Sequence, residues 1–128
     1  MDKKIISAGA IFGMVAIILG AFGAHALKKV LSVAQLSTFE TGVRYQMYHA
    51  LFLLVIGTIK EVSQKAKKTI YYLVIFGVIL FSGSIYLLAT NSLTAINFKT
   101  IGFVTPIGGA LLILAWSVFL FQSVKKKS

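Results

Sequence analysis

The sequence predicts an all-α integral membrane protein, built as a single domain (residues 1–128) of four transmembrane helices in a bundle. Of its 128 residues, 58% are hydrophobic and only 12% are charged, whereas charged residues make up about 25% of a soluble domain. The mean hydropathy is +0.90. The charges lie between uncharged runs that approach or exceed the roughly 20 residues needed to cross a bilayer. The predicted spans are about residues 5–27, 43–59, 69–90 and 101–123.

The first span begins after Lys3 and Lys4 and carries no charged residue up to Leu27. This segment has three features of a cleaved secretory signal: a basic start, an apolar run, and small residues in the Ala-His-Ala of residues 24–26. The apolar run is longer than the roughly 7 to 15 residues of a signal, and three further spans follow, so we expect a retained helix. Small residues at spacing four predict close packing on a neighbouring helix. They are Gly9, Gly13, Ala16, Gly20 and Ala24.

An interfacial amphipathic helix is predicted in the first outer loop, leading into the second span. Ser32 and Gln35 form a capping box there, and Ser37 with Glu40 forms a second one about a turn later. No proline lies between this capping box and the second span, and Gly42 lowers the stability of a helix by only about 1 kcal/mol. We therefore expect the interfacial helix to continue into the membrane, with Gly42 as the place for a kink.

A polar line on this helix consists of Glu40, Arg44 and Tyr48 at spacing four, beside an apolar stripe. One interpretation is a surface ion pair between Glu40 and Arg44. The alternative is that Arg44 holds a polar pocket or a lipid phosphate.

The third span is uncharged, and the fourth contains Thr105 followed by Pro106. One interpretation makes Thr105 the N-cap and Pro106 the first helical residue. The other is a proline kink within a longer helix. Glycines in both spans again predict close helix packing. They are Gly77, Gly83, Gly102, Gly108 and Gly109.

The basic residues predict that both termini are cytoplasmic. One side of the four spans would carry nine of them and the other side four, and the cytoplasmic side of membrane proteins is the more basic one. Lys28 and Lys29 run against this rule. The nine are Lys3, Lys4, Lys60, Lys65, Lys67, Lys68, Lys125, Lys126 and Lys127, and the four are Lys28, Lys29, Arg44 and Lys99.

Polar residues fall in the outer half of all four predicted spans, which predicts a buried, hydrogen-bonded cluster there. The candidate cluster consists of His25, Glu40, Arg44, Tyr45, Tyr48, His49, Ser82, Ser84 and Thr105. We expect Tyr45 and His49 to point into the bundle. Their expected neighbours are His25 and Ser82. Arg44 would then face Glu40, the lipid headgroups or a neighbouring subunit.

Three function classes fit this pattern. The favoured class is a structural or interaction protein, in which the polar cluster locks the bundle. The second is a lipid- or solute-binding, transport or channel component. The third is a redox protein in which His25 and His49, at similar depth, both ligate one haem.

The residue types present argue against most chemistry. The chain has no cysteine, and the first, third and fourth spans contain no carboxylate. We therefore expect no cofactor, no metal site and no proton-coupled exporter activity. The expected partners are the lipid bilayer, a second copy or another membrane protein, and a lipid or small polar ligand. Nucleic acid is not expected, because the basic residues lie mostly at span ends.

Four sequence blocks together resemble a known family. They are Gly20-Ala21-Phe22-Gly23-Ala24-His25, Tyr45-Gln46-Met47-Tyr48-His49-Ala50-Leu51, Phe81-Ser82-Gly83-Ser84-Ile85-Tyr86 and Thr105-Pro106-Ile107-Gly108-Gly109. In these blocks the chain resembles the small bacterial inner-membrane proteins of the YgdD and YwdK group, an uncharacterised protein family. The resemblance implies a four-helix protein of the bacterial cell membrane, and it implies no particular activity.

Overall fold

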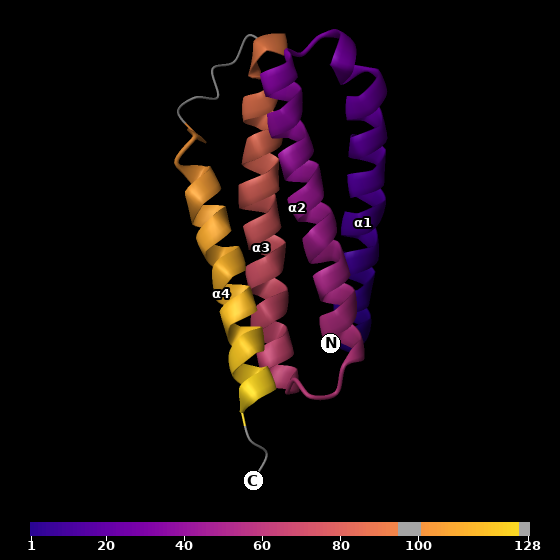
Figure 1. The fold of residues 1–128 in the computed structure, drawn as a ribbon. Coiled ribbons are helices and arrows are strands. Elements are labelled where there is room, and N and C mark those ends of the chain that lie inside the picture. Colours follow the sequence, from indigo (N-terminus) through magenta and orange to yellow (C-terminus); the bar gives the residue numbers. More distant parts are fainter. Residues whose placement is uncertain (95–100, 126–128) are drawn as a thin grey trace.

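The computed structural model describes residues 1–94 and 101–125, and the regular elements within them are all helices, as the sequence predicts. The elements are α1 (Asp2–His25), η1 (Leu27–Lys29), α2 (Val33–Thr58), α3 (Gln64–Ala89), η2 (Asn91–Leu93) and α4 (Val104–Val124). Successive long helices run antiparallel, so the start of α1, the α2–α3 connection and the end of α4 lie at one end of the molecule (Figure 1). The two 3₁₀ helices, η1 and η2, belong to the opposite end.

Three of the described helical segments are long and apolar enough to cross a membrane, as judged by length and composition. They are Asp2–Lys29, Gln64–Ala89 and Val104–Val124. α2, with 26 residues, is also long enough. It is less apolar than the others, because Arg44, Gln46 and His49 lie within it.

The long helices form a row in chain order, since α1 packs on α2, α2 on α3 and α3 on α4 (Figure 1). The main apolar core lies toward the end that carries the termini. Its fully buried members are Ile5, Leu53, Ile56, Ile70, Val74 and Ala115. A smaller cluster closes the opposite end and contains Leu27, Leu31, Phe39 and Ala89.

Polar contacts tie the helices together at the end that carries the termini. The ammonium of Lys67, which is buried, lies 3.2 Å from the carboxylate of Asp2 at the start of α1. Gln64 donates to the same carboxylate oxygen at 3.1 Å. The backbone N–H of Ser63 donates to the side chain of Gln122 near the end of α4, at 3.2 Å. These contacts link the start of α3 to both α1 and α4.

The start of α2 follows the prediction closely. Ser32 is the N-cap, and its capping box with Gln35 is complete in both directions. The residues expected to form an interfacial helix are the first turns of α2, which runs as one helix from Val33 to Thr58. At Gly42 an added Cβ would lie 2.7 Å from the ring of Tyr86, so this glycine permits close contact with α3.

The start of α4 differs from the prediction. The helix begins at Val104 after Phe103, which provides no side-chain cap, so the interpretation of Thr105 as the N-cap is wrong. The hydroxyl of Thr105 instead hydrogen bonds to that of Ser84 on α3. Pro106 is tolerated as the third helical residue, because the first four N–H groups of a helix have no intrahelical partner.

Glycines permit the closest helix contacts, as the spacing predicts, but not at every position. A Cβ on Gly9 would lie 2.8 Å from the backbone oxygen of Ala50 on α2, and one on Gly108 would collide with the backbone of Leu80 and Phe81 on α3. Gly83 is the exception, because nothing lies within 4 Å of the position its Cβ would take. The packing role predicted for Gly83 is therefore wrong.

Gly108→Ala should reduce the free energy of unfolding in detergent by about 1 to 3 kcal/mol, the usual cost of overpacking. The added methyl would collide with backbone that cannot rotate away. Gly83→Ala is the matched control and should leave stability unchanged or raise it by up to about 1 kcal/mol, through helix propensity alone. Equal losses in the two variants would contradict the α3–α4 packing described above.

Candidate functional site

Gln46 connects three helices. Its side chain is buried in the middle of α2, with a relative exposure of 4%. The side-chain NH₂ group donates to the backbone oxygen of Phe12 on α1 at 2.9 Å, and the side-chain oxygen accepts from the hydroxyl of Tyr86 on α3 at 2.6 Å. Gln46 lies on the same face of α2 as Gly42 and His49, at spacings of four and three residues.

Two buried serines of α3 add further links. Ser82 donates to the backbone oxygen of Gly42 on α2 at 2.8 Å, and Ser84 shares a hydrogen bond with Thr105 on α4. Among the described residues, every buried side-chain nitrogen or oxygen has a hydrogen-bond partner. In an apolar environment an unpartnered polar group is costly, so these bonds specify how the helices pair.

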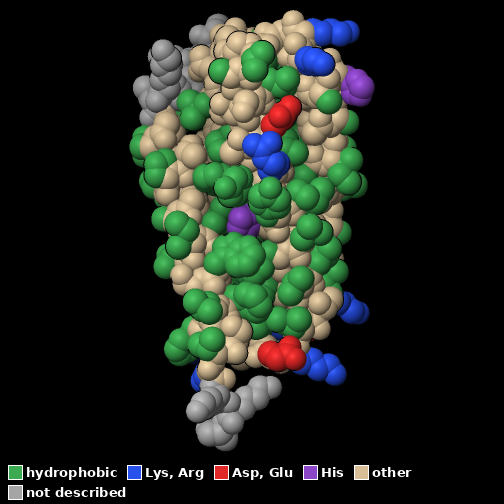
Figure 2. Space-filling view, in the orientation of Figure 1, with side chains coloured by type: hydrophobic (Ala, Val, Ile, Leu, Met, Phe, Trp, Pro, Cys, Tyr) green, Lys and Arg blue, Asp and Glu red, His purple; other side chains and the backbone are tan. Residues whose placement is uncertain are grey.

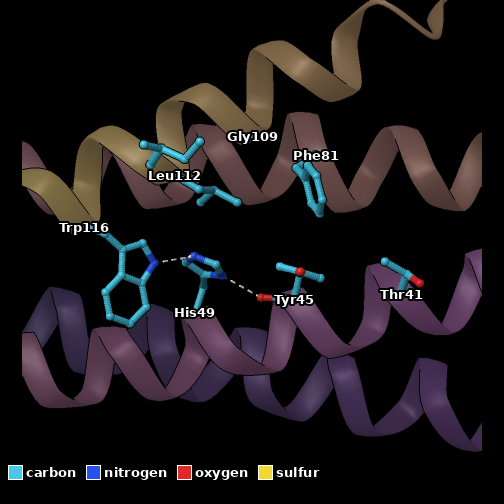
Figure 3. Close-up of a pocket in the computed structure, with 8 residues that line it drawn as sticks. Thr41, Tyr45, His49, Phe81, Gly109, Leu112 and Trp116 are labelled. Atoms are coloured by element: carbon cyan, nitrogen blue, oxygen red, sulfur yellow. Dashed lines mark hydrogen bonds between the residues drawn. The ribbon is translucent and has the colours of Figure 1, made fainter.

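His49 links α2 to α4. Its Nδ1 lies 2.7 Å from the backbone oxygen of Tyr45, and the indole N–H of Trp116 donates to its Nε2 at 3.0 Å (Figure 3). Because an indole N–H can only donate and a carbonyl can only accept, these partners specify the neutral tautomer protonated at Nδ1. Both ring nitrogens are thus engaged. The Nε2 lone pair, which a metal or haem iron would need, is used by Trp116.

An aromatic stack supports this link. Trp116 stacks on Phe52 with ring centroids 4.1 Å apart and planes inclined by 12°, and Phe119 meets Phe52 edge-on at 5.6 Å. These contacts hold α2 and α4 together toward the end that carries the termini.

Beyond His49, a groove opens between α2 and α4, above Phe81 of α3. We call it the α2–α4 groove; its volume is about 430 Å³. It runs from Trp116 at one end to Thr41 at the other (Figure 3). Its lining residues are Thr41, Tyr45, His49, Phe81, Gly109, Leu112, Ile113 and Trp116.

Two members of the predicted cluster, Tyr45 and His49, line this groove. Ser82, Ser84 and Thr105 form separate hydrogen bonds between helices instead. As expected, His49 is buried, but the half-exposed Tyr45 contributes a wall of the groove. Tyr48 is half-exposed and meets Tyr45 edge-on.

His25 lies apart from this region. It is exposed at the end of α1, where the adjacent Gly23 packs on Phe39 of α2. His49 is ten residues further along α2, which is about 15 Å at 1.5 Å per residue. The expectation that His25 and His49 share one depth and face each other is wrong, and one chain does not form the bis-histidine site that the redox alternative requires.

The Glu40–Arg44 ion pair is also not formed. Both side chains are exposed, and the Arg44 guanidinium donates instead to the hydroxyl of Thr41 at 3.1 Å. Within the described residues the only ion pair between side chains is that of Asp2 with Lys67.

Three residues of the network are missing from the predicted cluster: Gln46, Tyr86 and Trp116. A signal for Gln46 exists in the sequence, because a glutamine spaced three and four residues from His49 and Gly42 shares their helix face. Trp116 carries no such signal, because its partner is set by how α4 packs across α2.

Comparisons with known proteins match this chain to a family of unknown function and to relatives named as membrane proteins. A family model described as a protein of unknown function (DUF423) matches residues 19–109. A UPF0382 membrane protein of Staphylococcus saprophyticus is 43% identical over 123 residues, covering 96% of this chain and 98% of that protein. For the UPF0382 membrane protein YwdK of Bacillus subtilis, the identity is 36%, with coverage of 96% and 98%.

The UPF0382 inner membrane protein YgdD of Escherichia coli is 34% identical over 121 residues, covering 92% of this chain and 87% of that protein. No solved structure matches the chain. The matches confirm the resemblance inferred from the sequence, and they assign no activity.

His49→Leu should lower the unfolding temperature in detergent more than Arg44→Gln does. The first change removes the buried imidazole of His49 and leaves the indole N–H of Trp116 without its partner, at a cost of about 1 to 3 kcal/mol. The second removes one exposed contact, worth roughly 0 to 1 kcal/mol. Thermal unfolding of both purified variants tests this order. A stable His49→Leu beside an unstable Arg44→Gln would refute the assignment.

Proposed function

The chain belongs to the DUF423 family, and its relatives are UPF0382 membrane proteins of unknown function. On that premise we propose that it is a four-span structural or interaction protein of the bacterial cell membrane. Both termini lie in the cytoplasm. The polar network locks the helices, and the exposed α2–α4 face is the surface available to a partner.

The spanning of α2 is supported by its neighbours and by its contacts. α2 lies between α1 and α3, which are both apolar enough to cross a membrane. Gln46 and His49, which reduce its hydropathy, bond to other helices and are buried. Leu51 and Val55, which are exposed on its second half, are apolar. Such a helix satisfies its polar groups within the protein, as a span must.

The orientation is supported by charge. The end that carries the termini holds most of the described lysines, and the more basic side of a membrane protein faces the cytoplasm. Hydrophobic side chains cover the middle of the visible face, and most charged side chains lie toward its two ends (Figure 2). The first turns of α2, which carry Ser37 and Glu40, then lie at the outer interface. Lys99, Lys126 and Lys127 lie outside the described residues.

One observation carries the choice of a structural or interaction role. Each polar side chain buried within α2 and α3 near the groove bonds to an atom of a different helix. Hydrogen bonds of this kind between neighbouring helices are how polar residues stabilise membrane bundles. Ser82 and Ser84 are engaged in this way, so neither is paired with a histidine as an activated nucleophile would be.

Labelling of single cysteines tests all four spans, because the chain has no cysteine of its own. Cysteine is placed at Lys4, Lys29, Lys65, Ser92 or Lys125, all of them exposed. In intact cells a membrane-impermeant maleimide should label only the variants at Lys29 and Ser92, because one span separates each position from the next.

Permeabilised cells provide the control, since all five variants should label there. The reverse pattern would invert the proposed orientation. Labelling of the Lys29 and Lys65 variants on the same side would show that α2 does not span.

A further inference from the structure

We propose that the α2–α4 groove binds one phospholipid whose headgroup carries an ammonium, such as phosphatidylethanolamine. One acyl chain lies in the groove, the phosphate binds Arg44, and the ammonium lies beside Glu40. This inference rests on the proposed function, and it names the partner of the exposed α2–α4 face.

The groove matches a hydrocarbon chain in size and in chemistry. Its volume of about 430 Å³ falls in the range of roughly 300 to 1,000 Å³ that is typical of ligand sites. Phe81, Leu112 and Trp116 give it apolar walls. The ring nitrogens of His49 are already bonded to Tyr45 and Trp116. The interior therefore presents carbon to its occupant, which favours an acyl chain over a small polar solute.

A cation lies at the far end of the groove. Thr41 lines that end (Figure 3), and its hydroxyl accepts a hydrogen bond from one Nη of Arg44. A guanidinium has five N–H donors, and no carboxylate lies within ion-pair distance of this one among the described residues. Arg44 is exposed, so its remaining donors are available for two-pronged binding of a phosphate.

The charges follow the order of the groups in such a lipid. The guanidinium of Arg44 lies at the Thr41 end of the groove, and Glu40, which is exposed, is one turn before Arg44 on α2. A basic side chain lies between the hydrophobic middle of this face and an acidic side chain beyond it (Figure 2). An inserted phospholipid presents an acyl chain, a phosphate and an ammonium in the same order.

The position of Arg44 within α2 gives the phosphate a physical role. A charged side chain within a span is costly unless it reaches the interface or a partner. The long side chain of Arg44 turns toward Thr41, in the direction of the nearer membrane surface in the proposed orientation. A bound phosphate neutralises this cation where water is scarce.

Native mass spectrometry with defined lipids tests the proposal. The full chain in mild detergent is titrated with phosphatidylethanolamine, phosphatidylglycerol and phosphatidylcholine that carry identical acyl chains. The wild type should retain one lipid, with phosphatidylethanolamine the most tightly bound. Arg44→Gln should weaken binding of phosphatidylethanolamine about tenfold, as expected when a charge-assisted hydrogen bond is lost. Glu40→Gln should remove the preference for phosphatidylethanolamine over phosphatidylglycerol.

Blocking the groove tests its occupant separately. Gly109→Leu places a side chain in the groove and should abolish lipid retention. Gly83→Leu adds the same bulk where no atom lies within 4 Å of the Cβ position, and it should bind lipid as the wild type does. Unfolding temperatures of both variants confirm that they are folded.

Several outcomes would overturn the proposal: equal retention of the three lipids by the wild type, unchanged binding in Arg44→Gln, or unchanged binding in a folded Gly109→Leu. A dimer that binds no lipid would also overturn it, because a second copy of the chain would then occupy the groove. The titration is performed in detergent and does not depend on orientation. A reversed labelling pattern would therefore refute the proposed topology alone, and equal lipid binding would refute this inference alone.

Discussion

The side-chain amide of Gln46 imposes the central constraint on this structure. A buried amide in apolar surroundings must find hydrogen-bond partners for its nitrogen and its oxygen within the protein. Gln46 does so by contacting the backbone of α1 on one side and the Tyr86 hydroxyl of α3 on the other. These two bonds require α2 to lie between its neighbours at a defined axial position. The most polar of the four long helices therefore lies where its polar groups are covered.

The remaining contacts follow from that placement. With α2 against α3, Gly42 meets Tyr86 and its backbone oxygen accepts from Ser82. Gly108 brings α4 onto the other side of α3. α4 then reaches across to α2 through Trp116, which bonds to His49 and stacks on Phe52. These aromatic contacts lie toward the end of the molecule that carries the termini. The α2–α4 interface is therefore closed at that end and open further along the two helices, which leaves the groove.

The sequence allowed the helices to be predicted, but not their mutual alignment. Uncharged runs and the Ser32 capping box are local signals. The runs predicted four long helices, and the capping box predicted the start of α2 at its N-cap. The alignment of α1 on α2 depends on which surfaces interlock, so His25 and His49 could not be placed relative to each other. Thr105 was misassigned for a similar reason. The N-cap assignment reflects a local preference of threonine. The hydroxyl of Thr105 instead bonds to Ser84, more than twenty residues away in the chain.

A double-mutant cycle between Gln46 and Tyr86 tests whether the buried amide holds α2 to α3. Gln46→Met, Tyr86→Phe and the double variant are unfolded in lipid–detergent bicelles, and the coupling energy is taken from their free energies of unfolding. We expect a favourable coupling of about 0.6 to 1.7 kcal/mol, as measured for hydrogen bonds between membrane helices. Coupling within error of zero, with both single variants as stable as the wild type, would contradict it, because the buried amide would then not hold α2 to α3.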